Sequence, residues 1–208
     1  MKIKHITSSF PLAPFLFLFL FTSCQQDYSP KPRGYFRIQF PDKAYIKFNS
    51  ASRYSFDYPV YAQVLKDSSR NSQPGWVNVT FPQFNGRIHL TYHQITSKKD
   101  FNKLLEATRE LAFKHTVKAT AIDEGKIHYP DKRVFGTYYS IDGNTASAVQ
   151  FFLTDSTNNY LRGALYFDEQ PRLDSIKPVL KFIKEDIDKM IKTFEWKAPR
   201  PPKGGVQN

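Results

Sequence analysis

The residue with the clearest chemistry in this sequence is a cysteine close to the N-terminus. Cys24 is the only cysteine of the 208 residues, so it has no partner for an intramolecular disulfide. Lys2 and Lys4 precede an uncharged apolar run at residues 10–21, and Ser23 stands directly before the cysteine. A positive start, an apolar run of about 7–15 residues and small residues at a cleavage point are typical of a secretory signal. The pattern predicts export of the chain, with cleavage between Ser23 and Cys24.

The position of Cys24 resembles the lipobox of bacterial lipoproteins, where a cysteine thiol receives lipid. Ser23 fits that pattern, whereas Phe21 stands where leucine is usual. The apolar run is shorter than the roughly 20 residues that a membrane-spanning helix needs. Acyl chains contribute roughly 0.8 kcal/mol per buried methylene, and two chains hold a protein stably in a bilayer. We therefore expect a permanently membrane-attached protein. The alternative is ordinary secretion with an unmodified, buried cysteine.

The other residue types that carry chemistry do not form a recognisable active site. His89 and His93 are four residues apart in a strand-like segment, a separation of roughly 13 Å, which is too far for one zinc ion to bind both. Acidic residues occur as adjacent pairs, such as Glu185 with Asp186, which we interpret as solvated surface because paired acid–base catalysis needs convergent carboxylates. No nucleophile-elbow, phosphate-loop or dinucleotide-binding motif occurs. The sequence predicts neither an enzyme nor a metal or cofactor site.

The chain is basic, and its charge limits the possible partners. Residues 24–208 carry a formal charge of +9, which is the +11 of the whole chain less Lys2 and Lys4. Basic proteins bind nucleic acids, anionic membranes or acidic partners. Export argues against nucleic acid. An anionic leaflet attracts each nearby basic side chain by on the order of 1 kcal/mol, but we favour a solvated basic surface.

Hydrophobic periodicity predicts strands, a helix, further strands and a last helix. Alternating apolar residues indicate strands at 35–40, 54–59, 76–81, 87–95, 121–129, 133–141, 146–154 and 160–167. Helical spacing predicts one helix from Ser97 or Asp100 to His115, and a second that follows Ser175 as its N-cap. The polar segment between Ala62 and Gly75 predicts an exposed, mobile loop.

Turn-forming dipeptides predict how these strands pair. Asn85 with Gly86, and Asp142 with Gly143, are typical of hairpin turns, and short hairpin links make neighbouring strands antiparallel. The economical arrangement is an α+β fold, an antiparallel β-sheet with two principal helices packed on it. The order of elements resembles the Mog1/PsbP-like sandwich.

We expect four regions along the chain. They are a lipoprotein signal peptide at residues 1–23, a lipid anchor and tether at 24–34, a single globular domain at 35–197 and a disordered tail at 198–208.

Nearly the whole mature chain resembles one protein family. The runs YSPKPRGYFRIQFPDKAY, WVNVTFPQFNGRIHLTY, GNTASAVQFFLTDSTNNYLRGALYF and DSIKPVLKFIKEDIDKMIKTFEW are similar to the gliding motility lipoprotein GldD family of Bacteroidota. The resemblance implies a non-enzymatic, lipid-anchored component of the gliding motility and type IX secretion machinery in the cell envelope. It also implies partners among the other lipoproteins and membrane proteins of that machinery. We expect the domain to face the periplasm, from either the inner or the outer membrane. Only the lipid-bearing cysteine transfers from the family, onto Cys24.

A second function stays open because the chain contains 19 Phe and 12 Tyr residues. It is that of an envelope lipoprotein that binds a glycan or lipid ligand, and a concave aromatic pocket with convergent polar groups would favour it. For a partner surface, the candidates are aromatic and arginine residues, the types enriched at interface hot spots: Arg33, Tyr35, Arg37, Phe84 and Arg87. The alternative for Arg33 and Tyr35 is that they only dock the chain onto the sheet.

Overall fold

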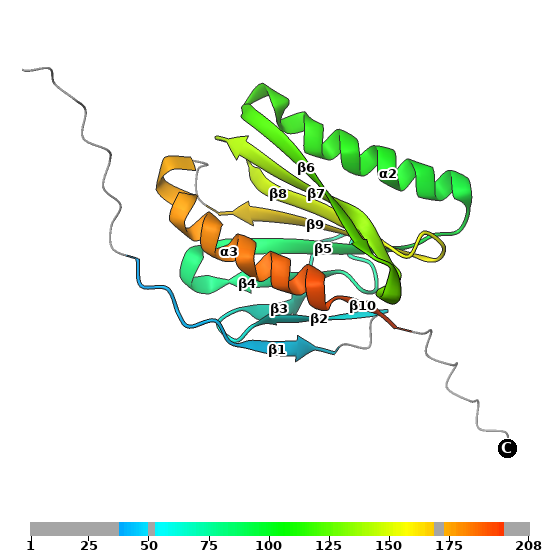
Figure 1. Ribbon diagram of the computed structural model, residues 1–208, viewed down its shortest axis with the longest axis horizontal. Coiled ribbons are helices and arrows are strands. Elements are labelled where there is room, and N and C mark those ends of the chain that lie inside the picture. The colour runs from blue at the N-terminus through cyan, green and yellow to red at the C-terminus, as the bar shows by residue number, and fades with distance from the viewer. Residues whose placement is uncertain (1–37, 50–52, 169–172, 198–208) are drawn as a thin grey trace, which may run out of the picture. The chain divides into compact units, whose positions relative to one another are not determined.

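The computed structural model describes residues 38–49, 53–168 and 173–197 (Figure 1). The expected signal peptide, the expected Ser23–Cys24 cleavage site, the expected tether and the expected disordered tail lie outside the described residues. So do Arg33, Tyr35 and Arg37 of the expected partner surface.

A seven-stranded antiparallel sheet forms the centre of the fold, in the order β3-β4-β5-β9-β8-β7-β6. Its strands are β3 (Gln63–Lys66), β4 (Val77–Phe81), β5 (Gly86–Gln94), β6 (Ala119–Tyr129), β7 (Val134–Gly143), β8 (Ser147–Thr154) and β9 (Asn159–Phe167). The expected antiparallel pairing is confirmed.

Both expected hairpins form, but only in the first does the predicted dipeptide contribute a residue to the link between the strands. Phe81 pairs with Gly86, and Asn85 closes the link between β4 and β5 with a positive φ of 48°. Asp142 and Gly143 do not turn the chain, because both belong to β7 and pair with β6. The long β6–β7 ladder therefore extends beyond the point where the dipeptide predicts a turn.

Two helices cover opposite faces of this sheet. They are α2 (Lys98–Phe113) and α3 (Leu173–Thr193). Every residue of β8 is buried, and its side chains alternate between the two faces. Phe151 packs in the cluster that contains the buried residues of α3, whereas Phe152 packs in the cluster beneath α2. The α+β class with two principal helices is confirmed, and the structure adds that the sheet lies between the helices.

The start of each helix can be compared with the sequence. The hydroxyl of Ser97 accepts a hydrogen bond from the Asp100 amide at 3.1 Å, so Ser97 is the N-cap of α2. The second helix begins at Leu173, two residues before the expected cap at Ser175. Pro178 therefore lies inside α3, where its missing N–H leaves the Asp174 carbonyl without the usual helical donor.

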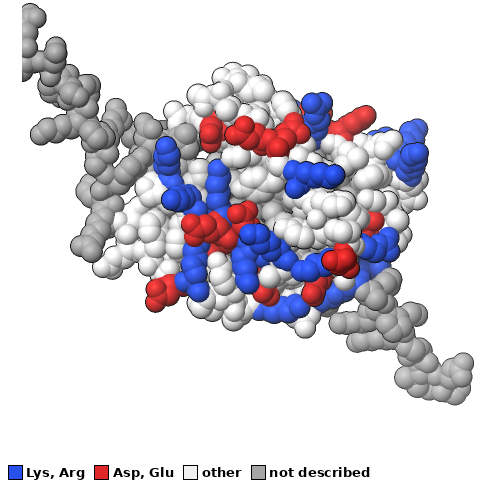
Figure 2. All heavy atoms as spheres, in the orientation of Figure 1, with Lys and Arg blue, Asp and Glu red and all other residues white. Residues whose placement is uncertain are grey.

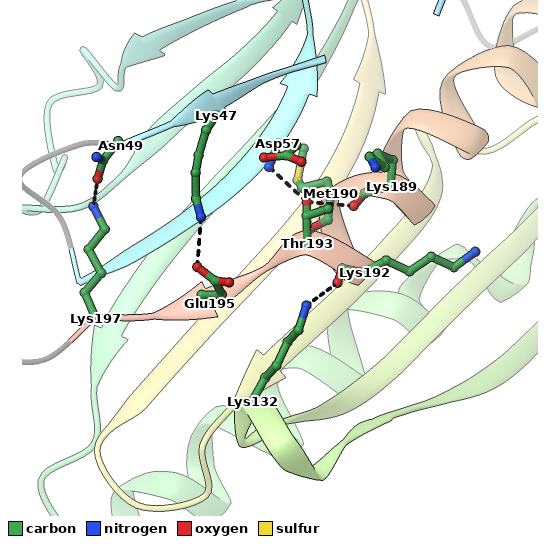
Figure 3. Close-up of polar contacts among 10 residues, drawn as sticks. All are labelled: Lys47, Asn49, Asp57, Lys132, Lys189, Met190, Lys192, Thr193, Glu195 and Lys197. Atoms are coloured by element: carbon green, nitrogen blue, oxygen red, sulfur yellow. Dashed lines mark hydrogen bonds and ion pairs between the residues drawn. The ribbon is translucent and has the colours of Figure 1, made fainter. Parts of the chain in front are cut away.

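A second, three-stranded sheet was not expected from the sequence. It consists of β1 (Tyr45–Phe48), β2 (Tyr54–Pro59) and β10 (Glu195–Trp196), in the order β1-β2-β10. The strand expected at residues 35–40 is wrong for residues 38–40, which have no regular structure. The small sheet is joined to the end of α3, because the Asp57 amide donates to the Thr193 hydroxyl at 2.9 Å (Figure 3). Tyr54 and Phe56 are fully buried there.

Gly163 in β9 provides a test of the core. A Cβ at this position would lie 2.2 Å from the fully buried Phe151 ring. We expect Gly163→Ala to lower the free energy of unfolding by about 1–3 kcal/mol in urea denaturation, because the core is overpacked. Gly125→Ala is the matched control, since a Cβ there meets nothing nearer than 3.9 Å, and its effect should stay within about 0.5 kcal/mol. Equal losses in the two variants would contradict this packing.

Candidate functional site

Residues 38–44, which we call the strap, connect the start of the described chain to β1 without regular structure. Phe40 of the strap stacks on Phe182 of α3, with ring centroids 4.5 Å apart, and lies 5.8 Å from the Phe84 ring. The Gln83 side-chain amide donates to the Gln39 carbonyl at 3.1 Å. The strap is therefore held between the β4–β5 connection and α3.

A fully buried carboxylate, Asp186 of α3, binds the end of the strap. The Lys43 ammonium lies 2.6 Å from Asp186 Oδ1. The Tyr45 hydroxyl donates to the same oxygen at 2.9 Å, and the Tyr61 hydroxyl donates to Oδ2 at 2.6 Å. We call these four residues the Asp186 cluster. One side chain thus joins the strap, β1, the β2–β3 turn and α3.

Helical spacing explains why α3 can present both an aromatic ring and a charge to the strap. Phe182 and Asp186 are four residues apart, so they lie one above the other on the same side of the helix. The Lys43 ammonium uses both, since it donates to the Phe182 carbonyl at 2.7 Å and lies 3.6 Å above the centroid of that ring. A buried charge is tolerated when it is paired and hydrogen-bonded, and Asp186 has three donors.

The two tyrosines of the cluster stay protonated well above neutral pH. Burial, followed by the hydrogen bond to Asp186 and its negative charge, raises the pKa of Tyr45 and of Tyr61 far above the ordinary value of 10.0. Both hydroxyls therefore remain donors to the carboxylate throughout the physiological range.

Sequence reasoning missed this cluster. The sequence analysis interpreted Glu185 and Asp186 together as solvated surface. This fits Glu185, whose side chain is 60% exposed, but is wrong for Asp186, whose side chain is 0% exposed. The available signal was position, because Asp186 lies three residues after Ile183 and four before Met190, both in the buried stripe of α3. Its partners come from more than 120 residues away, so no local pattern shows them.

Two of the residues expected at a partner surface can be placed. Phe84 is half-buried and packs against the strap and against Phe182, with ring centroids 5.6 Å apart. Arg87 of β5 lies 3.5 Å from the Asp168 carboxylate, and its side chain is 38% exposed. The structure brings Phe84, but not Arg87, into contact with the strap residue Phe40. Their role in binding stays a prediction.

A concave region, which we call the Trp76 pocket, lies where the β3–β4 connection passes the C-terminal end of β5. It has a volume of about 600 Å³ and is lined by Asn71, Gln73, Trp76, Tyr92, His93 and Gln94, together with Pro74. The Trp76 indole N–H donates to the Tyr92 carbonyl at 2.8 Å. The His93 ring lies 5.7 Å from the indole, whereas the His89 ring contacts Tyr166. The two histidines thus have separate partners.

Metal and membrane features were searched for within the described ranges. There, no three His, Cys, Asp or Glu side chains are grouped closely enough to hold a metal ion. No helix in the same part of the chain has the length and apolar character to cross a bilayer. On the face drawn in Figure 2, basic and acidic side chains are interspersed, which agrees with a solvated surface there.

Comparison with known proteins gives one family match and one similar fold. The model of the family described as "Gliding motility lipoprotein GldD" matches residues 25–196. No curated protein is similar to the chain in sequence. The solution structure of cyanobacterial PsbP (CyanoP) from Synechocystis sp. PCC 6803 is similar at a TM-score of 0.45 and 10% sequence identity, over 75% of this chain and 94% of that chain.

The Asp186 cluster predicts a large effect from removal of one cation. We expect Lys43→Met to lower the free energy of unfolding by roughly 2–4 kcal/mol, because it leaves a buried carboxylate without its counter-ion. The matched control is Lys47→Met, which removes the Lys47–Glu195 pair, whose side chains are about half exposed. Its effect should stay below about 1 kcal/mol. Urea denaturation measures both, and a Lys43→Met protein as stable as the control would refute the cluster's role.

The tyrosines predict loss of stability at alkaline pH. Below about pH 10 both the folded and unfolded states hold the phenolic protons, so the stabilisation is fully present. Above that pH the unfolded chain releases them while folded Tyr45 and Tyr61 retain them, so stability falls as pH rises. Urea denaturation at about pH 8 and about pH 11 should show this fall, and a smaller one in Tyr61→Phe. Ionisation of every phenol near pH 10 in the folded protein would contradict the prediction.

Proposed function

Because the chain belongs to the gliding motility lipoprotein GldD family, we propose that it is a structural or assembly component of the gliding motility and type IX secretion machinery. The observation that carries this proposal is the family match, which begins directly after Cys24 and continues to Trp196. The role that we propose is not catalytic. Its partners are other lipoproteins and membrane proteins of the same machinery.

The proposed attachment to the cell envelope is covalent lipid on Cys24. Residues 1–23 are removed on export, and residues 24–34 form the tether. About ten residues reach at most roughly 35 Å, so the domain stays close to the membrane that holds the lipid. We place the domain, residues 35–197, in the periplasm.

The strap supports a structural role for the domain. It is the first described segment after the tether, so a pull between membrane and domain enters the fold there. The Asp186 cluster connects the strap to β1, the β2–β3 turn and α3. A pull on the strap is therefore distributed over elements from both ends of the chain. A flexible peptide joined only to the surface of the domain would instead transmit the pull to the few residues that it contacts.

The proposed partner surface surrounds the strap. Phe40 is 38% exposed although it stacks on Phe182, and Phe84 lies beside it. With Arg87 these residues offer the aromatic and arginine side chains that are enriched at interfaces. A partner at this surface would bind close to the membrane anchor.

Deletion and complementation in the source bacterium test the proposal. We expect deletion to reduce colony spreading, type IX export or both, and the unaltered gene to restore what is lost. Cys24→Ser should leave the protein out of the membrane fraction and fail to restore function, because it cannot be acylated. Ser23→Ala is the matched control, since it keeps a small residue at the cleavage point and should complement fully. Normal colony spreading together with normal type IX export after deletion would contradict the proposal.

A further inference from the structure

The Trp76 pocket contains neutral polar groups in a strongly basic protein. Its lining provides three carboxamides, from Asn71, Gln73 and Gln94, and one imidazole, from His93. Burial lowers the pKa of His93 below its ordinary value, which favours the neutral form of the ring. Among the described residues, no Lys, Arg, Asp or Glu lines the pocket, although Asp100 acts on His93 and Arg53 acts on Tyr92 from outside the lining. A phosphate, a carboxylate or a metal ion would therefore meet no opposite charge in the lining itself, whereas carboxamides both donate to and accept from hydroxyl groups.

An aromatic ring lies among these polar groups. Trp76 is half-buried, and its N–H is used by the Tyr92 carbonyl, so the apolar part of the indole is what remains for a ligand. The edge-on His93 ring keeps the indole in place, at an interplanar angle of 67°. A sugar ring has the complementary character, with C–H groups across its face and hydroxyl groups around its rim.

The loop that forms one wall of the pocket is held by hydrogen bonds. The loop expected between Ala62 and Gly75 is shorter in the structure, because Gln63–Lys66 form β3 and pair with β4. Asn71 and Gln73 are exposed, as expected, but hydrogen bonds hold the backbone of the loop at both ends. The Asp67 amide donates to the Trp76 carbonyl at 3.2 Å. The Asp67 carboxylate accepts from Asn78 and from both the amide and the hydroxyl of Ser69. Binding would therefore not require the wall to be ordered first.

The floor of the pocket belongs to the core. Gly75 has a φ of +89° and packs directly on the Tyr92 ring, where an added Cβ would lie 3.3 Å from a ring atom. The buried Tyr54 hydroxyl donates to the Gly75 carbonyl at 2.6 Å, and the Tyr92 hydroxyl donates to Asn159 at 2.8 Å. Rigid supports of this kind hold the exposed groups in a fixed arrangement.

From this geometry we propose that the Trp76 pocket binds a short neutral saccharide of the cell envelope. Its volume of about 600 Å³ lies within the range of small-molecule sites, about 300–1,000 Å³. The ligand presents hydroxyl or acetamido groups to Gln73, Gln94 and His93 and an apolar ring face to Trp76. The site lies at the end of β5 and does not use the strap, so saccharide binding does not depend on the proposed role in gliding.

Titration of the purified mature chain with two neutral trisaccharides tests this proposal. The probes are maltotriose, made of plain hexose units, and triacetylchitotriose, made of N-acetylglucosamine units. They distinguish a site for plain hexoses from a site for N-acetylated sugars. Calorimetry should show saturable binding of at least one. Because the chain has two tryptophans, a change in tryptophan emission should persist in Trp196→Phe and disappear in Trp76→Phe.

Variants of the exposed amides separate binding from folding. The double variant Gln73→Ala/Gln94→Ala should weaken binding about tenfold at an unchanged unfolding midpoint, because both side chains are exposed. Asn102→Ala, which removes another exposed amide, on α2, is the matched control and should bind as the parent does. The proposal is overturned if neither trisaccharide binds saturably at millimolar concentrations, or if the double variant binds as tightly as the control.

Discussion

The negative charge of Asp186 is the constraint on which the N-terminal part of the fold depends. A carboxylate removed from water costs several kcal/mol unless partners compensate it. Here the compensation comes from Lys43, Tyr45 and Tyr61, which lie in three segments that precede the main part of the large sheet. If one of them is absent, the others still face a buried charge. The strap, β1 and the β2–β3 turn are therefore held against α3 as a unit.

The large sheet determines where each surface feature lies. Because α2 and α3 cover opposite faces, β8 is buried along its whole length and fixes the strands on either side. The strap crosses the α3 side near the β4–β5 connection, whereas the Trp76 pocket lies near the other end of β5. The strap and the Trp76 pocket thus lie at different ends of one hairpin, so the proposed membrane attachment and the proposed saccharide binding use separate surfaces.

The sequence predicts those strands and turns that are determined by a local pattern of residues. Period-two alternation locates most strands of the large sheet, and Asn85 with Gly86 locates a hairpin because a positive φ is needed there. The small sheet is not predictable in this way, since β10 pairs with β2 from the other end of the chain. Asp142 and Gly143 predict the turn too early in the chain, because both residues pair with β6 and this pairing outweighs their turn preference. Asp186 and the Trp76 pocket are missed because each is formed by side chains that meet only after folding.

The function that we propose is that of a domain held close to a membrane by lipid on Cys24. The proposed role in the gliding and secretion machinery depends on the acylation of Cys24, and mass spectrometry of the N-terminal peptide from the membrane fraction tests this acylation most directly. The account predicts that Cys24 is the first residue and carries diacylglycerol. A peptide that begins at Met1, or one in which Cys24 bears an unmodified thiol, would contradict it.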